Sequence, residues 1–81
     1  MAFYFVNTKA KTNGEHEIHK AGCLFMPSNV RRQYLGNFND SRDALHEAEH
    51  YFNHVNGCFY CSQESHITNT PYNSNNPATA G

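Results

Sequence analysis

The chain has 81 residues, a formal net charge of −1 and three cysteines. It is therefore one small domain, and its nearly neutral charge does not by itself favour a polyanionic partner. Three cysteines cannot all pair within one chain, and no basic, apolar leader opens the sequence. We therefore expect a cytoplasmic protein with no membrane span, and a monomer.

The first half of the chain has the composition of short strands. Residues 3–6 are aromatic and β-branched, which predicts a strand. The turn signal Asn13-Gly14 follows, and residues 15–19 alternate as a second strand. Residues 24–27 are apolar and end in proline, so we expect a packed loop there.

A third strand is expected over residues 33–38, with Gly36 as a bulge or a place where another group approaches closely. Side chains at even spacing line one face of a strand, so we expect Tyr34 and Phe38 on the same face. The two rings are either part of the core or a platform on which bases stack.

Residues 40–57 have the pattern of an amphipathic helix. Asp40 or Ser41 can cap its N-terminus. The apolar residues that follow fall on one side of a helical wheel: Ala44, Leu45, Ala48, Tyr51, Phe52 and Val55. We expect the helix to end near Gly57, as a left-handed cap directly before Cys58.

The last part of the chain has a different composition. Residues 65–81 contain no Lys, Arg, Asp or Glu and are rich in Asn, Thr, Pro and Ser. Such a segment cannot support a core, which predicts a disordered tail after a domain of residues 1–64. The expected fold class is α+β, with a few antiparallel strands and one amphipathic helix.

The cysteines stand at spacings typical of a zinc site. Cys58 and Cys61 form a Cys-x2-Cys pair, and His19 precedes Cys23 by four residues. Together they supply three thiolates and one imidazole, a complete set for one structural zinc ion. A domain of this size needs such an additional source of stability. His66 is the alternative to His19 as fourth ligand, and the alternative to a metal site is a set of buried or reactive thiols.

A second pattern of metal ligands lies within the expected helix. His46, Glu47 and His50 match the H-E-x-x-H pattern of zinc hydrolases. On a helical wheel, however, His46, His50 and His54 lie opposite the apolar side and face solvent. Because such a stripe implies no cleft, a metallohydrolase is the least favoured function, and we assign no catalytic residue.

The basic residues are concentrated in the first half of the chain. Residues 1–42 contain all six Lys and Arg and have a net charge of +3, whereas residues 43–81 have a net charge of −4. Four of the basic residues are candidates for contacts with nucleic-acid phosphates: Lys20, Arg31, Arg32 and Arg42. The alternative partner is another protein, bound through exposed aromatic residues such as Tyr34, Phe59 or Tyr60.

Three segments resemble the metal-binding domain of Ada-type DNA repair regulators and its relatives with a His/Cys3 zinc site. They are residues 19–23, residues 38–44 and residues 58–61, and the resemblance spans roughly residues 3–62. It implies the same small fold and a zinc ion.

The resemblance also bears on activity. In Ada, four cysteines hold the zinc, and the first of them accepts a methyl group from a DNA phosphotriester. His19 stands at the matching position here. An imidazole is a poor substitute for a zinc thiolate as a methyl acceptor. The resemblance therefore implies a structural zinc module rather than an enzyme.

Overall fold

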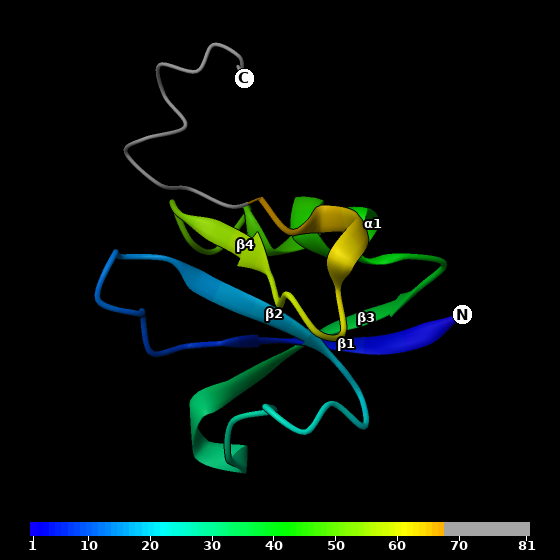
Figure 1. Ribbon diagram of the computed structural model, residues 1–81, viewed down its shortest axis with the longest axis horizontal. Helices are drawn as coiled ribbons and strands as arrows, with labels where there is room; N and C mark the ends of the chain where they lie inside the picture. The colour runs from blue at the N-terminus through cyan, green and yellow to red at the C-terminus, as the bar shows by residue number, and fades with distance from the viewer. Residues whose placement is uncertain (68–81) are drawn as a thin grey trace, which may run out of the picture.

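The computed structural model describes residues 1–67, which form a four-stranded mixed sheet with one helix on one face (Figure 1). The strands are β1 (Ala2–Asn7), β2 (His16–Lys20), β3 (Arg32–Phe38) and β4 (Val55–Gly57). The helix α1 spans Ser41–Ala48, and two 3-10 turns, η1 (Asn29–Arg31) and η2 (Gln63–Ser65), complete the elements. This architecture confirms the expected small α+β fold.

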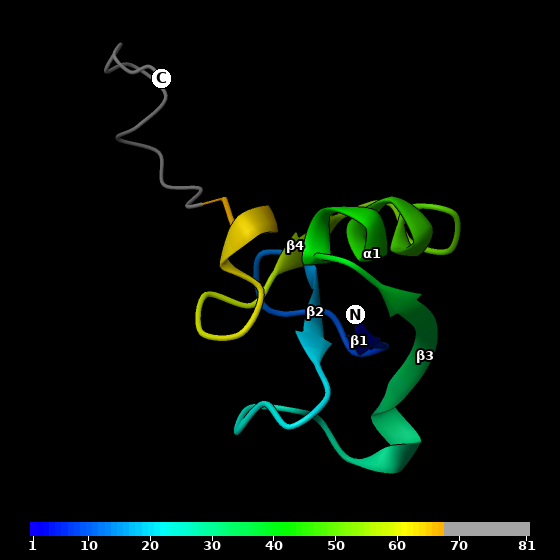
Figure 2. The ribbon, with the colours of Figure 1, turned by 90° about the vertical axis from the view of Figure 1, so that its right-hand side faces the viewer.

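The strands lie in the order β3-β1-β2-β4. β1 pairs antiparallel with both β2 and β3, whereas β4 pairs parallel with β2, so the sheet is not entirely antiparallel. Figure 2 views the sheet along its strands, with α1 crossing one face between β3 and β4. Because α1 carries the chain to the opposite edge of the sheet, β4 enters in the same direction as β2.

The core lies between α1 and the inner face of the sheet. Its buried apolar residues are Tyr4, Val6, Ile18, Leu35, Ala44 and Ala48. Alternation along β1 and β2 brings Val6 opposite Ile18, and neither side chain is exposed. Two alanines form the buried face of α1, and their small side chains allow the helix to pack closely on the strands.

The helix is shorter than its apolar pattern predicts. It ends at Ala48, and the amides of His50 and Tyr51 then bond to carbonyls three residues back, at 3.1 and 2.9 Å. The chain next extends into β4, which satisfies backbone groups along the edge of β2 that a longer helix would leave unpaired. The prediction of a helix to Gly57, with that glycine as a left-handed cap, is therefore wrong.

A bulge changes the direction of side chains along β3. The pairing with β1 shifts after Tyr4, and Leu35 is the extra residue, next to Gly36 with a φ of 139°. Tyr34 consequently lies on the outer face and is 53% exposed, whereas Phe38 packs against Tyr4 with 6.3 Å between ring centres. The expected bulge is confirmed, and the prediction that Tyr34 and Phe38 share a face is wrong.

The loop of residues 21–31 runs along the outer face of the sheet, on the side opposite α1 (Figures 1 and 2). Arg32 holds it there: the guanidinium donates to the carbonyl of Pro27 at 3.3 Å and lies 5.1 Å from the centre of the Phe5 ring. Leu24 is 95% exposed. The expected packed loop is therefore largely open to solvent at its apolar residues.

The end of the described chain packs on β4. Ser65 is buried, and the amide of Ile67 donates to the Asn56 side chain at 2.8 Å. Residues 65–67 of the expected tail thus contact the domain, and its remaining residues, 68–81, lie outside the described part of the chain. Within residues 1–67, no helix is long and apolar enough to cross a membrane.

Candidate metal centre

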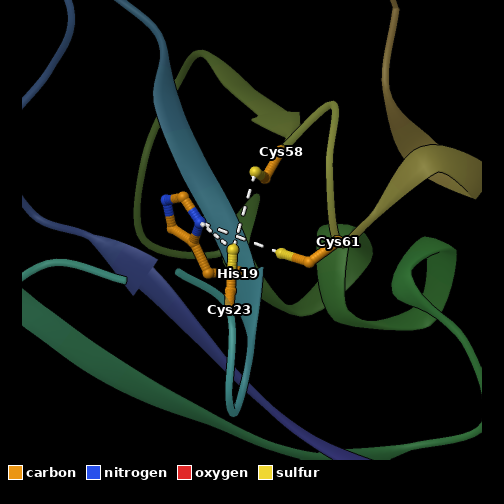
Figure 3. Close-up of side chains that lie close together, drawn as sticks. All are labelled: His19, Cys23, Cys58 and Cys61. Atoms are coloured by element: carbon orange, nitrogen blue, oxygen red, sulfur yellow. Dashed lines mark hydrogen bonds between the residues drawn. The ribbon is translucent and has the colours of Figure 1, made fainter. Parts of the chain in front are cut away.

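Four potential metal ligands meet beside β2 (Figure 3). His19 belongs to β2, Cys23 to the turn that follows it, and Cys58 and Cys61 to the turn after β4. The parallel pairing of β4 with β2 continues into this turn, because the amide of Cys58 donates to the carbonyl of Ile18 at 3.0 Å. This pairing brings together two half-sites that are far apart in the sequence.

Three distances between the ligand atoms are close to the edge lengths of a tetrahedral zinc site. Cys23 Sγ lies 3.6 Å from His19 Nδ1 and 3.9 Å from Cys58 Sγ. Cys61 Sγ lies 3.9 Å from His19 Nδ1, and all four ligand atoms lie within 4.8 Å of one another. With Zn–S near 2.3 Å and Zn–N near 2.0–2.1 Å, the edges of a tetrahedron are about 3.6 Å from N to S and about 3.8 Å from S to S.

Burial favours the neutral form of both the histidine and the cysteines of the cluster. His19 is 1% exposed, and burial lowers its pKa, an effect that nearby Glu17 opposes. The imidazole is therefore neutral at pH 7, as a ligand must be. Burial raises the pKa of Cys58 and of Cys61, so these thiols keep their protons at pH 7 until a metal displaces them.

Backbone amides point at all three sulfurs, and those of Tyr60 and Cys61 point at Cys58. The amide of Lys20 donates to Cys61 Sγ at 3.2 Å, and the amide of Phe25 donates to Cys23 Sγ at 3.4 Å. Three thiolates carry one negative charge more than a divalent cation neutralises. Hydrogen bonds to a charged group favour its charged form, so these amides suit a site that holds thiolates.

Glu17 is a site residue that the sequence analysis missed. Its Oε1 lies 3.4 Å from His19 Nε2, and its Oε2 lies 3.2 Å from Lys11 Nζ. Since Nδ1 faces the sulfurs, Nε2 carries the proton, and the carboxylate beside it orients the ring and raises its basicity. Glu17 and His19 are two residues apart within an expected strand, so both side chains lie on one face. This spacing could have identified Glu17 from the sequence.

Replacement of the carboxylate should weaken the metal site without unfolding the domain. We expect Glu17→Gln to lower zinc affinity by about 10- to 100-fold, because the histidine loses its orienting partner. Competition with a chromophoric chelator measures this change. Glu49→Gln, the same loss of charge on an exposed residue, is the matched control. Equal affinities for the two variants would show that Glu17 plays no part in the site.

An open cleft with a volume of about 540 Å³ borders the cluster. Cys23 and Cys61 line it, and the rings of Phe25 and Tyr60 stack beside them with 4.6 Å between their centres. Cys58 is not among the lining residues and is only 2% exposed. The three sulfurs therefore differ in their access to solvent.

The four basic candidates lie at three separate places in the fold, because Arg31 and Arg32 are adjacent. Arg32 holds the loop on the outer face, and Arg42 pairs with Asp40 at 2.8 Å at the start of α1, on the inner side. Lys20 ends β2 and lines the cleft, whereas Arg31 directly precedes β3. The structure thus does not gather them into one cluster.

The other histidines considered as ligands lie outside the metal cluster. His66 Nδ1 donates to the carbonyl of Gly57 at 2.7 Å, and His19 occupies the fourth place in the cluster. The side chains of His46 and His50 are 82% and 72% exposed. His50 follows the end of α1, so the expected helical spacing of the H-E-x-x-H residues is not kept.

The fold and the site define a small α+β domain with a four-residue His/Cys cluster that can hold a metal ion. Comparisons of the chain with family models, curated proteins and solved structures found no match. The function has to be inferred from the cluster itself.

Proposed function

We propose that this protein is a structural zinc-binding module without catalytic activity of its own. The observation that carries the proposal is the approach of four ligand atoms to within 4.8 Å of one another, at edge lengths that suit a tetrahedron. A set of three sulfurs and one imidazole nitrogen is typical of structural zinc. Such a set leaves no coordination position for water or a substrate.

The resemblance to the Ada-type metal-binding domain supports the same proposal. The matching segments contain all four cluster residues and the start of α1. At the place of the methyl acceptor stands His19, whose ring is held between the sulfurs and Glu17. We therefore propose that this domain shares the structural zinc site of the Ada-type domain but not its repair reaction.

The metal would add a cross-link between two segments that the pairing of β4 with β2 already brings together. His19 and Cys23 hold the end of β2, whereas Cys58 and Cys61 hold the turn after β4. Within residues 1–67, the apolar core has six buried residues. In a domain this small, a metal that joins two segments contributes a large share of the stability.

The proposal predicts one tightly held zinc ion per chain after native purification, measured by elemental analysis. His19→Ala should abolish it. The double variant His46→Ala with His50→Ala should retain it, because both side chains face solvent. Loss of tight zinc in the double variant would instead favour a hydrolase, and a folded protein that holds no metal would contradict the structural zinc site.

A weak contact with nucleic acid is a second proposal, supported by two exposed cations. Within residues 1–67, no ion pair involves Lys20 or Arg31. Arg32 and Arg42 already have partners within the same chain, the carbonyl of Pro27 and the carboxylate of Asp40. Two phosphate contacts would produce weak, sequence-independent binding with a slope of log affinity against log salt of about −2.

A fluorescence titration of labelled duplex DNA at low ionic strength tests this contact. Lys20→Ala should flatten the slope by about 1, because one phosphate contact is lost. Arg42→Ala is the control, since that side chain pairs with Asp40. Absence of binding at low salt would leave another protein as the partner, with the exposed rings of Phe59 and Tyr60 as its contact.

A further inference from the structure

We propose that Cys23 is a modification site for hydroperoxides, and that its oxidation leads to a disulfide with Cys58 and loss of the metal. This inference rests on the proposed zinc module. The three sulfurs differ in their access to solvent and in their hydrogen bonds. A structural zinc site does not need this difference.

The cleft decides which sulfurs a small oxidant can reach. Cys23 and Cys61 line the cleft, whereas Cys58 is 2% exposed and does not line it. Susceptibility of a thiolate to oxidation follows its exposure. A hydroperoxide therefore meets Cys23 or Cys61 first.

Hydrogen bonding distinguishes these two. Cys61 Sγ accepts the amide of Lys20 at 3.2 Å and lies 3.6 Å from Ser62 Oγ. Cys23 Sγ accepts one amide, that of Phe25, at the longer distance of 3.4 Å. Because donors draw electron density from a thiolate and lower its nucleophilicity, Cys23 is the more reactive of the two.

The neighbour of Cys23 can complete the reaction. Cys58 Sγ lies 3.9 Å from Cys23 Sγ, and a disulfide requires about 2.0 Å. The turn that carries Cys23 contains Gly22, which is exposed and has nothing within 4 Å of the position of a Cβ. A small movement of this turn therefore brings the two sulfurs together.

The chemistry balances with a hydroperoxide as the oxidant. The Cys23 thiolate attacks one peroxide oxygen, the O–O bond breaks, and the sulfur becomes a sulfenic acid, while the other oxygen leaves as hydroxide or alkoxide and takes a proton from solvent. The Cys58 thiolate then attacks the Cys23 sulfur, an S–S bond forms, and the hydroxide that leaves takes a proton to become water. Two cysteines lose two electrons, and the peroxide gains them.

The disulfide removes two of the four ligands. His19 and Cys61 alone remain, and they do not form the closed set that holds structural zinc tightly. Oxidation would thus be coupled to loss of the metal.

The test treats the zinc-loaded protein with hydrogen peroxide in the presence of a chromophoric zinc indicator. Zinc release should match disulfide formation one to one, and peptide mapping should find Cys23 joined to Cys58. With dimedone present, the sulfenic acid should be trapped on Cys23. Phe25→Ala, which removes a ring beside the cleft, should release zinc faster, whereas Tyr51→Ala, an exposed ring of the segment after α1, should match the wild type.

The outcomes separate the two proposals. A protein that binds no zinc contradicts the proposed module itself. A zinc-loaded protein that keeps its metal in excess peroxide overturns the modification site and leaves the module intact. Dimedone on Cys61 or Cys58 in place of Cys23 overturns the assignment of the reactive sulfur.

Discussion

Removal of the metal is expected to unfold the whole domain. Structural zinc in small modules contributes about 10–16 kcal/mol of apparent binding free energy at neutral pH. The net stability of a folded domain is only about 5–15 kcal/mol. The six buried apolar residues of this core include two alanines, which bury little surface. The free energy lost with the metal is therefore larger than the remaining contacts can offset.

Chelation followed by NMR spectroscopy measures this effect. Excess chelator should collapse the dispersed amide signals of the sheet, and added Zn²⁺ should restore them. Mg²⁺ should not, because it prefers oxygen ligands in octahedral geometry. Cys58→Ser should behave like the chelated protein even in excess zinc. Retention of dispersed signals in chelator would show that the cluster is not the main source of stability.

Gly57→Ala is expected to have the largest effect among substitutions outside the four ligands. An added Cβ would clash with Ser65 Oγ and would lie 2.5 Å from the carbonyl oxygen of Ser62. The hydroxyl can rotate away, but the carbonyl belongs to the backbone of the buried turn that follows Cys61. Relief of the contact therefore has to move either β4 or this turn, and with it a metal ligand.

We expect Gly57→Ala to cost about 3 kcal/mol, the upper part of the range for overpacking. A change of this size lowers the melting temperature of so small a domain by on the order of 10–20 °C. Thermal unfolding in excess zinc measures it. Gly14→Ala is the comparison: its positive φ of 88° strains an alanine, but nothing lies within 4 Å of a Cβ, so its melting temperature should fall less than that of Gly57→Ala. Equal melting temperatures for the two variants would mean that the turn does not pack on Gly57.

The sequence by itself determined the components of the metal centre. The spacing of His19 and Cys23 and that of Cys58 and Cys61 are local properties that do not depend on how the halves pack. A ligand set also has its own chemical preference, so the residue types alone predict zinc as the metal. The bulge at Gly36 was predictable for the same reason, because a glycine within a strand pattern acts through its own backbone.

The tertiary structure decided where the helix ends and which way side chains face. Residues 49–57 continue an apolar helical pattern, but the free edge of β2 offers backbone hydrogen bonds that a solvated helix end cannot match. Likewise, one extra residue in β3 placed Tyr34 and Phe38 on opposite faces. The sequence pattern shows neither result, because each depends on a strand that lies far away in the sequence. That strand is β2 for the end of the helix and β1 for the bulge in β3.

The tertiary structure also decided which residues surround the site. Glu17 beside the imidazole, Asp40 beside Arg42 and the loop held by Arg32 all depend on distances in space. The cleft exists because the turns that carry Cys23 and Cys61 meet without covering each other. Local spacing thus specified which atoms can bind a metal. The pairing of β4 with β2 decided that they meet, and which of the sulfurs remain accessible.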